Sequence, residues 1–188
     1  MTFSVLARYF KKLEETASRN SMTEILADLF GHAEAREIGE LCYILQGRVV
    51  PLYEAIEFGV ADQFMIRSIA LAYGVEEKHV RTEFKKVGDL GVVAESIRYQ
   101  VLGIKYQNDH LHIREVYKKL YELATTTGVG SQEKKITLLA DLFKSVDALS
   151  ARYIARIPLG KLREAGSRQG VMHTAPCNHQ GLLRHLQP

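Results

Sequence analysis

Three short segments of the chain combine glycine with a helix-capping residue or a cation, and this combination can bind anions. They lie at residues 88–91 (Gly-Asp-Leu-Gly), 128–131 (Gly-Val-Gly-Ser) and 157–163 (Ile-Pro-Leu-Gly-Lys-Leu-Arg). Glycine lets backbone N–H groups approach a ligand closely, and the N-terminus of a helix carries a partial positive charge. Because phosphate groups bind at such positions, several of them in one chain favour a phosphate backbone as the ligand.

The chain lacks common motifs of nucleotide and metal chemistry. It contains no Lys-x-Asp-Gly, no phosphate-binding G-x-x-x-x-G-K-[ST] and no H-E-x-x-H. Ser96 and Ser131 have no histidine near them in the sequence to form a nucleophilic pair. Irregular spacing, without a C-x-x-C pair, argues against a zinc site near the C-terminus. The possible ligands there are His173, Cys177, His179 and His185. We therefore expect no catalytic residue and no metal site.

The composition is that of an ordinary globular protein, long enough to bury a core. The 188 residues are 46% hydrophobic and 25% charged, and no apolar run approaches the ~20 residues that a membrane span needs. The N-terminus enters an amphipathic helical pattern directly, so we expect no signal peptide. The two cysteines provide no disulfide framework, which favours an intracellular location, cytoplasmic or nuclear.

Positive charge is concentrated towards the C-terminal third of the chain. The net charge is +3, and residues 131–163 hold seven cations against three anions. A polyanion would interact with this region first. A solvated helix face explains the same cluster without any ligand, and both interpretations stay open.

Hydrophobic periodicity predicts helices along nearly the whole chain. They are expected at about 5–13, 21–30, 38–45, 62–73, 76–86, 91–102, 113–126, 131–143 and 148–157. Residues of helix-capping type begin four of these segments: Ser21, Asp62, Asp89 and Ser131. Ser21 and Glu24 also match a capping box. The expected fold class is all-α, with a compact multi-helix domain at 1–163 and an irregular C-terminal tail at 164–188.

The segment at 128–132 is the strongest candidate for an anion site. Its two glycines precede Ser131, and Lys134 and Lys135 fall in the first turn of the following helix. Cations at this position oppose the helix dipole by roughly a few tenths of a kcal/mol, so a bound anion would explain them. We expect both lysines on the surface, where replacing them with Glu would weaken binding with little effect on folding. The alternative is an exposed charged face without a ligand.

The other two segments are less specific. Lys85 and Lys86 precede the 88–91 segment, and Asp89 is expected to cap a helix that starts near Gly91, leaving N–H groups free for a ligand. A plain helix–loop–helix corner would have the same sequence features. The last segment carries cations beyond a helix end, where cations are also ordinary partners of the helix dipole. They are Arg156, Lys161 and Arg163.

Five segments of the chain occur in the same order as in a known family. They are 52–60 (LYE and FGV), 88–95 (GDLGVVAE), 130–135 (GSQEKK), 139–143 (LADLF) and 151–163 (ARYIARIPLGKLR). Over about residues 1–163 the chain resembles the N-terminal DNA-binding domain of ATP-dependent DNA ligases. The resemblance implies an all-helical domain that binds the minor-groove face of nicked duplex DNA. It works there with a nucleotidyltransferase domain and an OB-fold domain.

The resemblance also implies which residues contact DNA. The family's phosphate-contacting loops would correspond to 88–91 and 128–135, with cations of 156–163 as further contacts. The candidate DNA-binding residues are Gly88, Asp89, Leu90, Gly91, Gly128, Gly130, Ser131, Gln132, Lys134, Lys135, Arg156, Lys161 and Arg163. Full-length members of the family use ATP and Mg²⁺. The adenylated lysine, the metal-binding carboxylates and the OB fold have no counterpart here, so we expect no cofactor and no ligation by this chain alone.

After residue 163 the resemblance stops, a departure that suggests a truncation or a shifted reading frame. The expected partners are duplex or nicked DNA and the catalytic domains of the ligase, with no membrane. Without a helix rich in Asn, Gln and Arg to read base edges, DNA binding should show little sequence preference. Two alternatives are an all-helical protein–protein interaction module and a sequence-specific helix-turn-helix regulator. DNA binding and its sequence dependence separate them.

Overall fold

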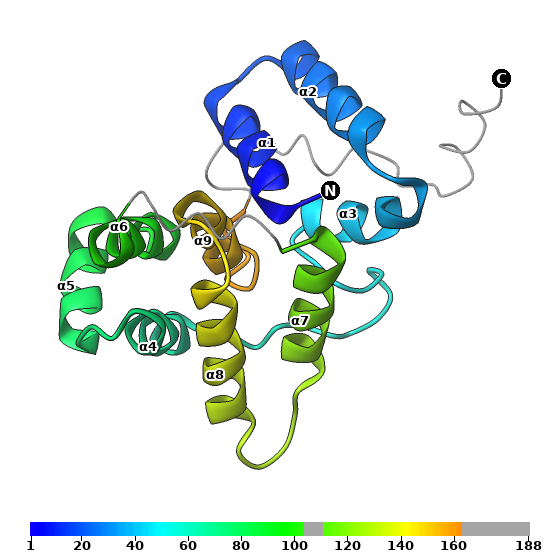
Figure 1. The fold of residues 1–188 in the computed structure, drawn as a ribbon. Helices are drawn as coiled ribbons and strands as arrows, with labels where there is room; N and C mark the ends of the chain where they lie inside the picture. Colours follow the sequence, from blue (N-terminus) through cyan, green and yellow to red (C-terminus); the bar gives the residue numbers. More distant parts are fainter. Residues whose placement is uncertain (104–110, 163–188) are drawn as a thin grey trace, which may run out of the picture.

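The structure, a computed structural model, describes residues 1–103 and 111–162 (Figure 1). These residues form nine α-helices and one short 3-10 helix, Ala35–Glu37. The α-helices are α1 (Phe3–Glu15), α2 (Arg19–His32), α3 (Ile38–Leu45), α4 (Asp62–Tyr73), α5 (Glu77–Val87), α6 (Leu90–Leu102), α7 (Ile113–Thr125), α8 (Ser131–Lys144) and α9 (Ala148–Arg156). No strand occurs in this part of the chain, where Thr2 and His112 form one isolated antiparallel bridge. The predicted all-α class is therefore confirmed.

Local sequence explains most helix ends, but the caps predicted at Ser21 and Asp62 need correction. Gly74 and Gly88 end α4 and α5 in the left-handed conformation, as glycine allows. The capping box predicted at Ser21 is wrong, because α2 begins two residues earlier and Ser18 accepts a hydrogen bond from the Ser21 N–H at 3.4 Å. Asp62 is the first residue of α4 and forms no side-chain cap, since Ala61 takes the N-cap position.

The helices pack in three groups around one continuous core. Figure 1 shows α4, α5 and α6 on the left, α8 and α9 in the centre, and α2, α3 and α7 on the right, with α1 crossing above α9. α6 packs closely on α9, and α4 packs on α8. Fully buried side chains at the centre include Phe3, Leu6, Phe143 and Tyr153. This packing places α9 where it contacts both α1 and α6.

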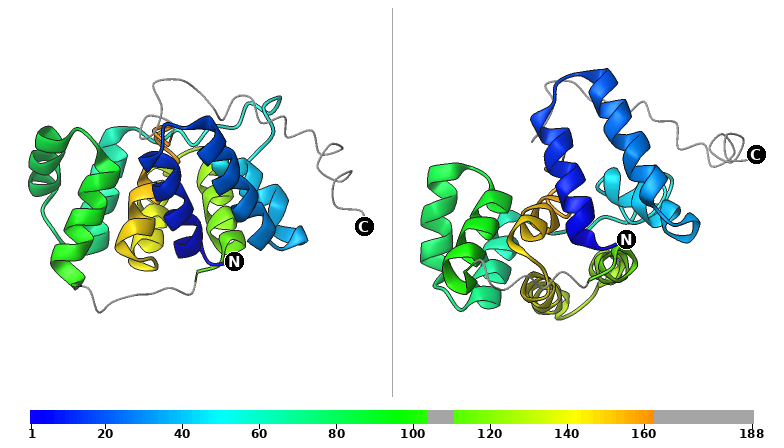
Figure 2. Two further views of the ribbon diagram at one scale, coloured as in Figure 1. Left: turned by 90° about the horizontal axis from the view of Figure 1, so that it is seen from above. Right: turned by 45° about the horizontal axis from the view of Figure 1, so that its top comes forward.

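The directions of these helices bring three helix ends to one side of the molecule. Figure 2 (left) shows the C-terminal ends of α1 and α9 beside the N-terminal end of α6. The α7–α8 loop lies at the far end of α8, at the bottom of Figure 1. Two of the three segments singled out in the sequence, 88–91 and 157–162, are therefore neighbours. The third, in the α7–α8 loop, is separated from them by the body of the domain.

Parts of the sequence predictions fall on residues that the structure does not describe. Arg163, the tail at 164–188 and its histidines and cysteine lie outside the described residues. Within the described ranges, no helix has both the length and the apolar character needed to cross a membrane.

Candidate nucleic-acid interface

The turn between α5 and α6 is built by two residues with different tasks. Gly88 has a φ of 77°, and its N–H donates to the Phe84 carbonyl at 2.7 Å. Asp89 is the N-cap of α6, where its Oδ1 accepts hydrogen bonds from the N–H groups of Gly91 at 2.7 Å and Val92 at 3.2 Å. The predicted cap is confirmed. The expectation that N–H groups stay free at this helix start is wrong for these two, because the Asp89 carboxylate accepts from both.

Gly91 serves the packing of α6 against α9. A Cβ atom at this position would lie 2.6 Å from the Arg152 carbonyl oxygen and 2.9 Å from the Arg156 Cγ. Leu90, next to it, is fully buried in the core. Only Gly88 of the 88–91 turn is exposed, since Asp89 is half-buried. The turn therefore presents backbone to the surface, while its side chains face the protein.

Arg156 lies under this turn with its guanidinium held by two carboxylates. Its Nε and Nη2 donate to the Asp89 Oδ2 at 3.0 and 2.8 Å. Its Nη1 donates to the Glu14 Oε2 at 3.0 Å, and Nη2 donates to the Glu14 Oε1 at 3.4 Å. Only 3% of Arg156 is exposed. Because a buried cation needs paired anions, this arrangement explains the residue without a bound phosphate.

The ionisation of Asp89 follows from these contacts. Burial alone would raise the pKa of its carboxyl group. The hydrogen bonds and charge of Arg156, together with the N–H groups of Val92 and Gly91, outweigh burial and hold that pKa below its ordinary value. Burial alone would lower the pKa of Arg156, but its hydrogen bonds and charge interactions with Asp89 and Glu14 outweigh burial and raise that pKa. Both groups are ionised at neutral pH.

The α7–α8 loop has a different construction. Gly128 and Gly130 have φ values of 91° and 79°, and no atom lies within 4 Å of a Cβ built at either position. Val129 between them is fully exposed. Ser131 does not cap α8 as predicted, since Gly130 is the N-cap and no side chain completes it. The left-handed glycine turns the chain, so the serine becomes the first helical residue, and the loop exposes the backbone of its two glycines and the side chain of Val129.

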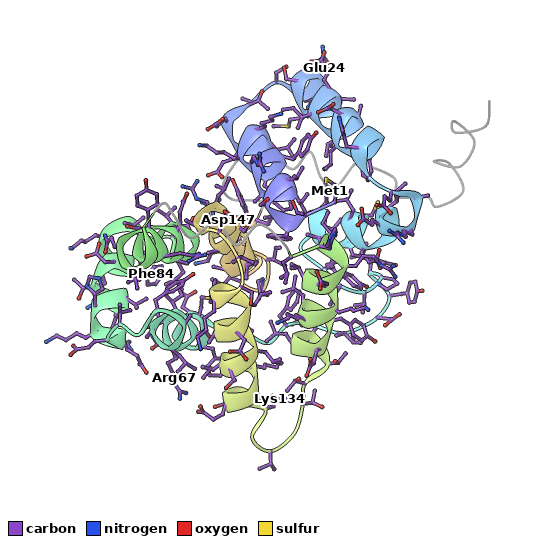
Figure 3. All side chains as sticks on the ribbon, in the orientation of Figure 1. Met1, Glu24, Arg67, Phe84, Lys134 and Asp147 are labelled. Carbon is purple, nitrogen blue, oxygen red and sulfur yellow. The ribbon has the colours of Figure 1, made fainter. Side chains whose placement is uncertain are left out.

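The two lysines at the start of α8 have different environments. Lys134 is 58% exposed, with its Nζ 3.1 Å from the Glu122 Oε1 on α7, and Figure 3 shows it beside the loop. Lys135 is only 8% exposed, and its Nζ donates to the Phe58 carbonyl at 2.6 Å. Burial lowers the pKa of Lys135. The prediction that both lysines lie on the surface is therefore wrong for Lys135. Successive helical residues point about 100° apart, so one faces solvent and the other the protein.

Residues 58–62 contact cations from two of the candidate DNA-contacting segments, 128–135 and 156–163. The Phe58 carbonyl accepts the hydrogen bond from Lys135, and the Asp62 Oδ1 lies 3.7 Å from the Lys161 Nζ. The Lys161 ammonium also sits 5.7 Å from the centre of the Phe84 ring, just before the α5–α6 turn. Lys161 is therefore close to the 88–91 turn on one side and to the segment reached by α8 on the other.

Ion pairs between distant helices, which the sequence did not indicate, hold the start of α8 in place. Arg67 of α4 donates to Glu133 of α8 at 2.8 Å and lies 3.7 Å from Glu77 of α5. Glu14 and Phe58, the partners of Arg156 and Lys135, were missed as well. No local spacing could have found them, because each partner lies on another helix or loop.

Among residues 1–103 and 111–162, no group of three or more His, Cys, Asp and Glu side chains could hold a metal ion.

Comparison with known proteins agrees with the resemblance seen in the sequence. The family described as "DNA ligase N terminus" matches residues 2–174. A "Probable DNA ligase" of Dictyoglomus thermophilum is 40% identical over 163 residues, which cover 87% of this chain and 27% of the relative. A second from Dictyoglomus turgidum is 41% identical over 92% of the chain and 28% of the relative. A "DNA ligase" of Acidianus ambivalens is 37% identical over 87% and 29%. The chain thus spans less than a third of the length of these curated relatives.

Proposed function

Because the chain belongs to the DNA ligase N-terminal family, we propose that it is the DNA-binding domain of an ATP-dependent DNA ligase. It binds the phosphate backbone and minor groove of nicked duplex DNA in replication, repair and recombination. The observation that supports this most directly is the presence of exposed glycines near cations at two places, Gly128 and Gly130 with Lys134 at the start of α8, and Gly88 with Lys161. Exposed glycine backbone and cations both bind phosphate groups.

The proposed contacts divide into exposed groups and supporting groups. The exposed groups that would reach phosphates are those of Gly88, Gly128, Gly130, Gln132 and Lys134, with the half-buried Ser131 and Lys161 beside them. Asp89, Leu90, Gly91, Lys135 and Arg156 hold these groups in position. Arg163 stays a proposed contact outside the described residues. Backbone contacts carry no base information, so binding should depend little on DNA sequence.

The chemistry of sealing is proposed to belong to other ligase domains. They would use ATP and Mg²⁺, the first as source of the adenylate and the second to offset phosphate charge. This domain would hold the nick so that the reacting ends stay aligned, which contributes proximity and orientation. Its partners are therefore nicked duplex DNA and those domains.

Fluorescence anisotropy with a labelled nicked duplex tests the proposal. The affinity should fall as salt rises, with a slope of about −0.9 per phosphate neutralised. Unlabelled duplexes of unrelated sequence should compete equally well. An all-helical protein–protein module would show no such binding, and a helix-turn-helix regulator would prefer one sequence over the others. Either result would refute the proposal.

A further inference from the structure

Asp89 uses its two carboxylate oxygens for two separate purposes. Oδ1 caps α6 through the Gly91 and Val92 N–H groups, and Oδ2 accepts both bonds from Arg156. The cap fixes the local shape of the 88–91 turn. The Arg156 bonds fix the place of that turn relative to α9, on which the start of α6 is already seated without space for a Cβ at Gly91.

Arg156 extends this link to a third helix. Its guanidinium also donates to Glu14 at the end of α1, and the Tyr153 hydroxyl donates to the same carboxylate at 2.8 Å. The planar fork therefore joins α1, α9 and the α5–α6 turn through one side chain. A lysine could not reproduce this geometry, because its ammonium is a point charge without the fixed donor fork.

The charge of Arg156 matters as much as its shape. The Asp89 carboxylate stands at the start of α6, beside exposed backbone of Gly88 that the proposed function places against a phosphate. An uncompensated carboxylate there would repel the phosphate. Arg156 neutralises this carboxylate from the buried side, so the exposed surface of the turn stays accessible to an anion.

We propose that Arg156 is a positioning residue for DNA binding: it touches no DNA, but it holds and neutralises Asp89 so that the 88–91 turn fits the phosphate backbone. This inference rests on the proposed function. It assigns to Arg156 a role opposite to that of a surface cation, which would contact a phosphate directly. The two roles give opposite expectations for substitutions at Arg156 and Asp89.

Arg156→Lys and Asp89→Asn, each measured for anisotropy with the nicked duplex, separate the roles. Arg156→Lys keeps the charge, so a direct phosphate contact would survive, whereas a positioning role predicts binding weaker by about tenfold. Asp89→Asn removes a negative charge. Electrostatics alone would then strengthen binding to a polyanion, but loss of the Arg156 anchor should weaken it. The double variant should bind no worse than the weaker single variant, since both act through one link.

Controls distinguish this role from general damage to the fold. Arg114→Lys changes the same residue type on α7, where the side chain pairs with Glu40, and should bind within about twofold of wild type. Thermal melts of each variant report folding. If Arg156→Lys does not fold, Glu14→Gln tests the same link to Arg156. Like Asp89→Asn, it removes a negative charge, and the positioning role nevertheless predicts weaker binding to DNA.

Each result has a defined meaning. Normal binding by Arg156→Lys, or tighter binding by Asp89→Asn, would overturn the positioning role while leaving the proposed function standing. Absence of DNA binding by the wild-type chain would refute the proposed function and the inference that rests on it.

Discussion

The Lys134 ammonium lies 3.1 Å from the Glu122 carboxylate, across the loop between α7 and α8. The cation placed best to reach a phosphate is therefore already paired with an anion of the protein. DNA would have to compete with Glu122 for Lys134. Exposed ion pairs of this kind contribute only about 0.2–1 kcal/mol, so the exchange is feasible.

Replacing Glu122 with Gln should therefore strengthen DNA binding by up to about fivefold, because Lys134 no longer exchanges one partner for another. Anisotropy titrations with nicked duplex at fixed salt measure the change. Glu24→Gln is the matched control, since it removes the same charge from α2 at the opposite end of the molecule (Figure 3). Equal gains in the two variants would indicate a net-charge effect and contradict the competition.

Lys135→Met should lower the free energy of unfolding by about 1–3 kcal/mol, because it leaves the buried Phe58 carbonyl without its donor. Urea denaturation measures this value. Lys134→Met, one residue away and exposed, should change it by less than about 0.5 kcal/mol. Similar values for both would show that the buried hydrogen bond contributes little.

Gly91→Ala should destabilise the protein by about 1–3 kcal/mol, since the new methyl group would overlap the Arg152 carbonyl oxygen. Gly39→Ala in α3 is the comparison. Nothing lies within 4 Å of a Cβ there, so its stability should stay equal or rise by up to about 1 kcal/mol. Thermal and urea unfolding of the pair would settle it, and a tolerated Gly91→Ala would mean that α6 can move off α9.

Asp89 should make folding sensitive to acid. Its carboxyl pKa is lower in the folded state than in the unfolded state, so the stabilisation is complete above the unfolded value of about 3.9. It is lost as the pH falls through the folded value. The melting temperature of wild type should therefore fall more steeply below about pH 4 than that of Asp89→Asn. Parallel curves for the two proteins would contradict this assignment.

The chain should form no covalent adenylate. Incubation with labelled ATP and Mg²⁺, followed by denaturing gel electrophoresis, should leave it unlabelled, because no Lys-x-Asp-Gly occurs in its sequence. A full-length relative serves as the positive control. A labelled band would require a nucleophilic lysine that none of the motifs above indicate.

Much of the fold could be predicted because its signals are local. Helical periodicity identified the helices, and α4 and α5 end at left-handed glycines within one residue of the predicted ends. The Asp89 cap involves N–H groups only two and three residues away, so it too could be read from the sequence. Capping failed at Ser21, Asp62 and Ser131, where an earlier residue, Ser18, Ala61 or Gly130, occupied the N-cap position.

The sequence by itself thus determined the helical class, most helix ends, the family and the candidate corners. Only the tertiary structure decided which cations are available to a ligand. Arg156 is separated from Asp89 by 67 residues and Lys135 from Phe58 by 77, so no spacing along the chain links them. Packing of α9 against α1 and α6 gives Arg156 its partners Glu14 and Asp89, and Phe58, in the segment before α4, gives Lys135 its partner. Both cations are buried. Lys134, next to the buried Lys135, stays exposed because the side chains of adjacent helical residues point about 100° apart.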